Sequence, residues 1–87
     1  MLMPYHQSVS PTVFRWKGYR FYFFSREEPR IHIHVRDANG QAKFWIEPEV
    51  ALEKNYGLKE DEIIDLLNII TKRKREIIDA WHKHFTD

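Results

Sequence analysis

The sequence predicts an α+β domain, in which a small antiparallel sheet of three to four strands packs on one face against a short and a long C-terminal helix. Two observations lead to this prediction. The first half of the chain alternates aromatic or β-branched residues with polar ones, between Gly, Pro and Asn turn signals, and the second half carries apolar residues at helical spacing. A run of strands followed by a run of helices is typical of the α+β class.

The composition indicates one small folded domain. In its 87 residues, 43% are hydrophobic and 15% are aromatic, enough for a single core. The absence of cysteine excludes disulfides, thiolate metal sites and cysteine nucleophiles. No apolar run approaches the roughly 20 residues that span a bilayer, and no signal-peptide pattern opens the chain, so we expect a cytoplasmic protein without membrane association. Residues 1–10 show no period and predict a flexible extension before a domain at 11–87.

The first two strands are predicted at residues 12–16 and 19–25, joined by a tight turn at Lys17-Gly18. Aromatic residues fall on both faces of the second strand, with Phe21 on one side and Tyr22 on the other. Neither face is then freely solvated, so we expect one face in the core and the other partly covered.

A hairpin over residues 31–47 carries the most unusual pattern. Asn39-Gly40 can supply the two positive-φ residues of a type I′ turn, which fixes a register between the flanking strands. That register pairs Val35 with Phe44, Ile33 with Ile46, Arg36 with Lys43, His34 with Trp45, and His32 with Glu47. One face of the hairpin is then apolar, and the other gathers histidines, cations, a tryptophan and a carboxylate. Because a one-residue slip would exchange the two faces, the burial pattern supports this register.

Two helices are expected after the hairpin. Pro48 and the acidic residue that follows it predict a short helix over residues 49–54, ended by a left-handed Gly57. A long helix is predicted from about residue 59 to about residue 85. Its apolar stripe consists of Ile63, Leu66, Leu67, Ile70, Ile77, Ile78, Trp81 and Phe85. Lys74 interrupts that stripe, and we expect its stem to cover apolar surface.

Several segments together resemble a known family. GYRFYFF, EPRIHIHV and AKFWIEP, followed by a C-terminal helix ending in AWHKHF, are similar to a group of small prokaryotic proteins classified as domain of unknown function 4160. The resemblance covers about residues 11–85. It implies a gene arrangement like a toxin–antitoxin pair, and therefore a small partner protein encoded nearby and a toxin-like role. It brings no established reaction.

The leading hypothesis is a toxin-leaning component of such a two-gene module, which binds a partner protein, RNA or each in turn through the polar hairpin face. The residues expected to bind are Tyr22, Arg36, Lys43, Trp45 and Glu47. Trp45 and Tyr22 would stack on bases, as aromatic side chains do in single-stranded RNA readers. No cofactor is expected.

Two alternatives stay open. His32 and His34 could act as general acid and base of a metal-independent endoribonuclease, with nearby cations stabilising the transition state. The same two histidines with Glu47 could instead form a two-His-one-carboxylate metal site in a non-catalytic domain. A plain protein interface would also look basic and aromatic, so the sequence leaves these readings undecided.

Overall fold

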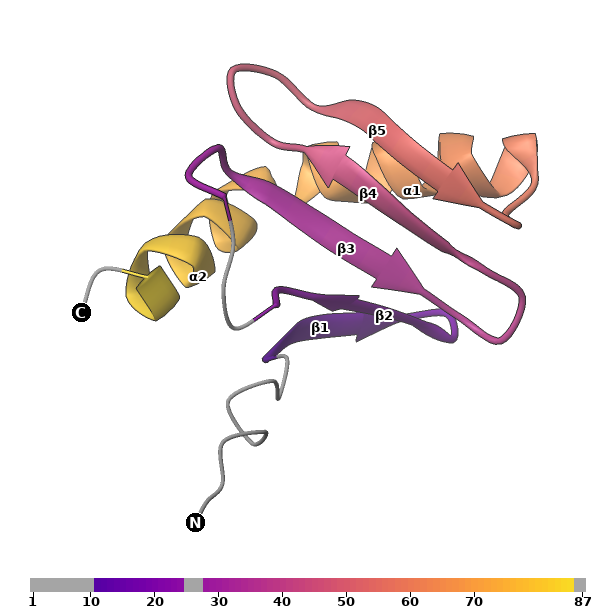
Figure 1. Ribbon diagram of the computed structural model, residues 1–87, viewed down its shortest axis with the longest axis horizontal. Coiled ribbons are helices and arrows are strands. Elements are labelled where there is room, and N and C mark those ends of the chain that lie inside the picture. Colours follow the sequence, from indigo (N-terminus) through magenta and orange to yellow (C-terminus); the bar gives the residue numbers. More distant parts are fainter. Residues whose placement is uncertain (1–10, 25–27, 86–87) are drawn as a thin grey trace, which may run out of the picture.

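The computed structural model describes residues 11–24 and 28–85, which form an antiparallel sheet followed by two helices (Figure 1). The elements are β1 (Thr12–Trp16), β2 (Tyr19–Tyr22), β3 (His32–Arg36), β4 (Gln41–Trp45), β5 (Ala51–Tyr56), α1 (Glu60–Lys72) and α2 (Lys74–Phe85). The α+β class and the antiparallel sheet are confirmed, but the described residues contain five strands where three to four were predicted. The predicted extension at residues 1–10 lies outside the described residues.

The sheet is a simple meander in the order β1-β2-β3-β4-β5, each strand antiparallel to its neighbour. Both helices lie behind one face of the sheet, and none of the described residues forms a helix over the other (Figure 1). We call the helix-covered side the inner face and the other side the outer face.

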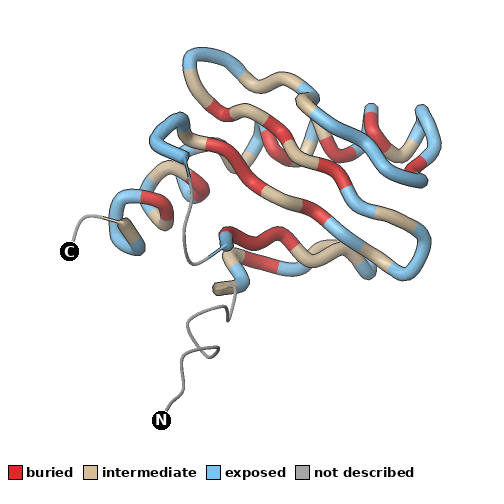
Figure 2. Tube along the Cα trace, viewed as in Figure 1, coloured by how far each residue is buried: buried red, intermediate tan, exposed pale blue. Residues whose placement is uncertain are grey.

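The core lies between the inner face and the helices. Figure 2 shows buried positions alternating along β3 and β4. The largest fully buried apolar side chains are Phe21, Phe23, Phe44, Ile33, Ile46, Leu66, Ile70, Ile77 and Val35. Phe21 stacks on Phe14 of β1 with their ring centroids 4.3 Å apart, and Phe23 meets the edge of Trp81 from α2 at 5.3 Å. The predicted aromatic core face of the second strand is therefore confirmed.

The turn between β1 and β2 is also as predicted. Lys17 has a φ of 48° and Gly18 a φ of 82°, so both central residues adopt the left-handed conformation that a two-residue hairpin turn requires. Tyr22, on the opposite side of β2 from Phe21, is buried although it belongs to the outer face.

The predicted register of the β3–β4 hairpin is wrong by two residues. Val35 pairs with Ala42, and Ile33 pairs with Phe44. The turn between the two strands runs from Asp37 to Gly40 and is not formed by Asn39-Gly40 alone. The Asp37 N–H donates to the Gly40 carbonyl at 3.0 Å, and the Asp37 Oδ1 accepts hydrogen bonds from the N–H groups of Asn39 and Gly40. Because side chains alternate with period two, a two-residue shift changes every partner and leaves every side chain on its predicted face.

The predicted helix at residues 49–54 is also wrong, since this segment forms β5. It pairs with β4 from Gln41↔Tyr56 to Trp45↔Ala51, with a bulge near its middle. A six-residue helix cannot offset its own nucleation cost, whereas the free edge of β4 offers a full set of backbone partners. Gly57 does have a positive φ of 91°, but it ends a strand rather than a helix.

The predicted long helix is divided by a kink at Arg73, between the end of α1 at Lys72 and the start of α2 at Lys74. Backbone hydrogen bonds continue across the joint, because Arg73 N–H donates to the Ile69 carbonyl and Ile77 N–H donates to the Arg73 carbonyl. Two residues earlier the Thr71 hydroxyl donates to the Leu67 carbonyl at 2.8 Å, a back-bond that bends helices. The Arg73 guanidinium lies 3.6 Å from the centre of the Phe14 ring and anchors the kink to β1.

One polar contact fixes α1 against the sheet. The Tyr19 hydroxyl of β2 donates to Glu62 Oε1 at 2.5 Å, and Lys59 N–H donates to Glu62 Oε2 at 3.0 Å. Burial raises the pKa of Tyr19, and the hydrogen bond to Glu62 raises it further. The hydrogen bond from the Tyr19 hydroxyl has the largest effect in lowering the pKa of the Glu62 carboxyl, and the hydrogen bond from the Lys59 amide lowers it further. The ionised carboxylate therefore holds the first turn of α1 to β2.

Gly40 is expected to be indispensable because of a close approach between two loops. A Cβ at this position would lie 2.2 Å from the Tyr56 carbonyl oxygen. Gly40→Ala should therefore lower the free energy of unfolding by about 1–3 kcal/mol, as forced overpacking does, in denaturant unfolding. Gly18→Ala is the matched control, since a Cβ there meets nothing within 4 Å and only the positive φ is penalised. An unchanged midpoint for Gly40→Ala would contradict the observed approach of the two loops.

Tyr19→Phe should destabilise the protein in a pH-dependent way. Because the folded-state pKa of Glu62 lies below its ordinary value of 4.5, this group stabilises the fold above that pH. The stabilisation is lost as the pH falls through the lowered pKa. The difference in thermal midpoint between wild type and Tyr19→Phe should thus be largest near neutral pH and shrink in acid. Tyr56→Phe, at an exposed tyrosine, should show no such trend; a constant difference for Tyr19→Phe would count against the contact.

Candidate functional site

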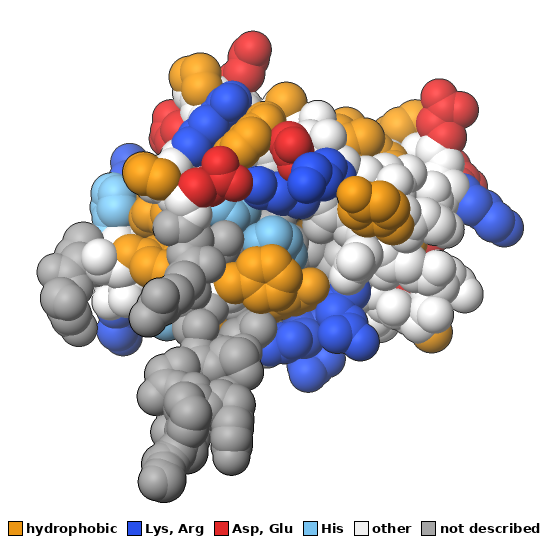
Figure 3. All heavy atoms as spheres, viewed as in Figure 1, with side chains coloured by type: hydrophobic (Ala, Val, Ile, Leu, Met, Phe, Trp, Pro, Cys, Tyr) orange, Lys and Arg blue, Asp and Glu red, His pale blue; other side chains and the backbone are white. Residues whose placement is uncertain are grey.

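The outer face of the sheet carries polar and aromatic side chains from all of its strands. The strand pairing places on it Arg15, Arg20, Tyr22, His32, His34, Arg36, Gln41, Lys43, Trp45, Lys54 and Tyr56. Figure 3 looks onto this face and shows a histidine and hydrophobic side chains between two groups of Lys and Arg side chains. The predicted gathering of histidine, cation and tryptophan on one side of the hairpin is therefore present, although its internal pairs differ.

A hollow of about 400 Å³ opens on the outer face, and we call it the aromatic hollow. Its lining comes from β2, β3, β4, β5 and the segments after β2, and includes Tyr22, Phe24, Glu28, His34, Lys43, Lys54 and Tyr56. Two of its aromatic rings are strongly exposed, since Phe24 retains 45% and Tyr56 retains 60% of its accessible surface. The hollow thus combines a concave shape with aromatic rings and the cationic Lys54.

His34 lies inside the aromatic hollow and is held between two aromatic rings. Its ring centroid is 5.5 Å from that of Tyr22, with a near-parallel stack, and 4.1 Å from that of Phe24. Tyr22 is directly opposite His34 on the neighbouring strand, so the register of β2 and β3 creates the stack. The predicted pairing of His34 with Trp45 is not observed, because His34 is opposite Lys43 on β4.

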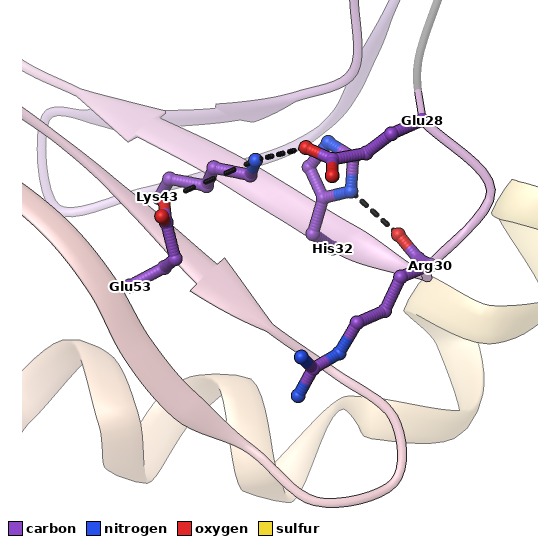
Figure 4. A network of polar contacts seen from close by, with 5 residues as sticks. All are labelled: Glu28, Arg30, His32, Lys43 and Glu53. Atoms are coloured by element: carbon purple, nitrogen blue, oxygen red, sulfur yellow. Dashed lines mark hydrogen bonds and ion pairs between the residues drawn. The ribbon is translucent and has the colours of Figure 1, made fainter.

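His32 does not stand on an open surface, contrary to the prediction. It is on the outer face, but its accessible surface is 0% because it is enclosed where β3 begins. Its Nδ1 lies 2.6 Å from the Arg30 carbonyl oxygen (Figure 4). A carbonyl can only accept, so Nδ1 carries the proton. Trp45 and Trp81 both present ring contacts to the imidazole, at centroid distances of 5.7 and 5.2 Å. His32 is therefore a packing residue.

Lys43 is the centre of an ion-pair network on the outer face. Its Nζ lies 2.5 Å from Glu28 Oε1 and 3.9 Å from Glu53 Oε1 (Figure 4). Glu53 reaches this position through the bulge in the β4–β5 pairing. Its Oε1 is buried and has no hydrogen-bond partner among the described residues. Carboxylates from two separate segments thus largely compensate the charge of Lys43. The predicted register instead places Lys43 opposite Arg36.

Trp45 is partly covered by cations. The Arg30 guanidinium lies 3.9 Å and the Lys43 ammonium 4.6 Å from the ring centre. Arg30 Nε also donates to the Glu47 carbonyl at 2.9 Å. Trp45 occupies the position opposite His32 that Glu47 was predicted to hold. The ring is therefore already engaged by cation–π contacts, which reduces its area as a stacking platform.

The metal alternative is not favoured by this geometry. His32 and His34 are neighbours, with ring centroids 5.1 Å apart, but Glu47 lies beyond the end of β4. Among residues 11–24 and 28–85, no group of three or more His, Asp or Glu side chains could hold a metal ion.

The exposed aromatic rings and the exposed lysine of the hollow, Phe24, Tyr56 and Lys54, were among the residues that the sequence did not predict. Lys54 and Tyr56 were assigned to or just after a helix, and Phe24 was treated only as part of a covered strand face. The available signal was the length of the stretch from Ala51 to Tyr56, which is typical of a strand and short for a helix. Because acidic residues after Pro48 also favour a helix start, local pattern alone could not separate the two outcomes.

Comparison with known proteins establishes the family. A family profile described as Domain of unknown function (DUF4160) matches residues 18–82, about three quarters of the chain, and the protein belongs to that family. No curated protein and no solved structure matches it significantly. Within the part of the chain that the structure describes, no helix is long and apolar enough to cross a membrane.

The two histidines should differ sharply in their effect on stability. His32→Ala removes a fully buried ring with a hydrogen bond, and we expect it to lower the free energy of unfolding by at least about 2 kcal/mol. His34→Ala leaves a half-buried position and should cost clearly less. Denaturant unfolding of both variants measures the difference. Equal losses for the two variants, or an unchanged stability of His32→Ala, would contradict the packing role of His32.

Proposed function

We propose that this protein binds single-stranded RNA through the outer face of its sheet, as the toxin-leaning component of a toxin–antitoxin-like two-gene module. The observation that carries the RNA-binding part is the aromatic hollow, in which exposed Phe24 and Tyr56 flank His34 and Lys54 on the sheet face opposite the two described helices. The two-gene module rests on the resemblance of the sequence to its family.

The physical basis of binding is stacking combined with charge. Unpaired bases stack on aromatic side chains of an open sheet face, and each stack contributes about 1–3 kcal/mol. Tyr56 lies on the edge strand β5 and Phe24 beyond the end of β2, so the two rings stand on opposite sides of the hollow. A base entering between them would meet His34 at the floor and Lys54 at the rim. In the proposed module, a small partner protein encoded nearby would occupy the same face in the absence of RNA.

The metal-independent endoribonuclease receives less support than binding alone. Acid–base cleavage by two histidines requires both rings to reach the substrate. His34 lines the aromatic hollow, whereas His32 is enclosed and its Nδ1 is bound to a backbone carbonyl. Lys43, which would stabilise the transition state, is already paired with Glu28 and Glu53. The chemistry of the site therefore favours a binding surface.

Fluorescence anisotropy with a labelled single-stranded oligoribonucleotide tests the proposal. Tyr56→Ala should weaken binding by roughly 5- to 150-fold, the equivalent of one lost stacking contact of about 1–3 kcal/mol. Ile64→Ala is a matched control, because Ile64 is 52% exposed but lies on α1 behind the sheet. It should bind like the wild type.

Two outcomes would overturn the proposal. Failure of the wild type to bind at low salt, or an equal loss for Tyr56→Ala and Ile64→Ala, would exclude the aromatic hollow as an RNA site. Cleavage of the oligonucleotide in the presence of EDTA, if it disappears in His34→Gln, would instead favour the ribonuclease.

A further inference from the structure

Three arginines lie in one row across the first three strands of the outer face. Arg15 of β1 is directly opposite Arg20 of β2, and Arg20 is directly opposite Arg36 of β3. Neighbouring strands are about 4.8 Å apart, so the three Cα atoms fall within roughly 10 Å. We call this set the arginine row.

Such a row is unfavourable in the isolated protein, because like charges directly opposite each other on neighbouring strands destabilise a sheet. Among residues 11–24 and 28–85, no carboxylate forms an ion pair with Arg15 or Arg36. The nearby Asp37 uses its Oδ1 to accept the amides of the hairpin turn. Lys43, on the same face, differs in having two carboxylates within 4.0 Å. The arginine row is therefore a concentration of positive charge in which two members lack a described acidic partner.

The central arginine is held in place by its neighbours. Arg20 Nε donates to the Thr12 hydroxyl at 2.6 Å, and its guanidinium lies 4.5 Å from the centre of the Tyr22 ring. These contacts fix the side chain along the sheet and reduce the entropy that binding would cost.

The space above the row is open. A shallow hollow of about 510 Å³ is lined by the three arginines together with Thr12, Gly18 and Asp37. Gly18 adds no side chain at the rim, and even a Cβ there would meet nothing within 4 Å. All three cations are arginines, whose planar forked N–H groups match phosphate oxygens in a bidentate way that lysine cannot.

We propose that the arginine row binds phosphate groups of the RNA whose bases stack in the aromatic hollow. This inference rests on the proposed function and names the part of the ligand that each hollow takes. Arg20 and Tyr22 are two residues apart on β2, and Arg36 and His34 are two apart on β3, so the two hollows adjoin on one face. A strand crossing this face would place its backbone over the arginine row and its unstacked bases between the exposed rings.

The test is the salt dependence of oligoribonucleotide binding. Each phosphate contact of a single strand contributes about 0.7 to the slope of log K against log salt, so Arg15→Gln/Arg36→Gln should lower the slope by about 1.4. Arg20 is left intact because it also contacts Thr12 and Tyr22. Lys72→Gln/Arg75→Gln is the control of equal charge change, at exposed positions at the C-terminal end of α1 and in α2, and it should leave the slope near the wild-type value. An unchanged slope in the outer-face variant, with binding retained, would overturn the arginine row and leave the RNA proposal standing.

The source of the phosphate is distinguished by oligonucleotides of one sequence with a 5′-phosphate or a 5′-hydroxyl. Equal affinities, with the loss of slope in Arg15→Gln/Arg36→Gln, assign internal phosphodiesters to the row. A preference for the 5′-phosphate that this variant abolishes assigns the terminal group. Both results support phosphate recognition.

Tripolyphosphate provides a readout that does not depend on RNA. It should raise the thermal midpoint of the wild type and of the helix control, but not that of Arg15→Gln/Arg36→Gln. If tripolyphosphate acts in this way while no oligoribonucleotide binds, the proposed RNA function fails and the phosphate site stands. If a polyglutamate peptide raises the midpoint as strongly as tripolyphosphate does, the row recognises acidic protein instead and the phosphate assignment is overturned.

Discussion

Both faces of the sheet carry large side chains, and the helices that the structure describes cover one of these faces. Phe21, Phe44 and Ile33 on the inner face are fully buried under α1 and α2, and burial of such side chains provides most of the stability of a small domain. The helical segment changes direction at Arg73, and beyond this kink Trp81 of α2 contacts both Phe23 and His32. The aromatic and charged side chains of the outer face contact one another, and some of them have more partners than others.

This difference distinguishes side chains that are engaged within the protein from side chains that a ligand could contact. Lys43 has two carboxylates, Trp45 has two cations, and His32 has a carbonyl and two aromatic neighbours. These contacts hold the three side chains in place. Tyr22 and His34 line the aromatic hollow, and the arginine row adjoins it on the same face, with exposed rings in one and closely spaced arginines in the other. Exposed rings and closely spaced cations contribute little to folding, and we therefore expect a ligand to bind at these two hollows.

The faces of the strands were predictable from sequence, while their partners were not. Alternation places Ile33 and Val35 inside and His34 and Arg36 outside whatever the turn, and this prediction held although the register was wrong by two residues. The turn itself depended on Asp37, whose carboxylate competes with the Asn39-Gly40 signal by binding two amides. β5 was missed because the free edge of β4 outweighs a local preference for helix. The enclosure of His32 depends on Trp81 of α2, which is distant in sequence, so local pattern could not show it.

We propose that the outer face of the sheet is the RNA-binding surface of this protein. Mapping of amide and side-chain NMR shifts during titration with a single-stranded oligoribonucleotide tests it most directly. We expect the shifts to concentrate at Tyr22, His34 and Tyr56 and at the guanidinium groups of Arg15 and Arg36, with α1 and α2 nearly unaffected. Shifts confined to the helices, or no saturable shifts at low salt, would contradict it.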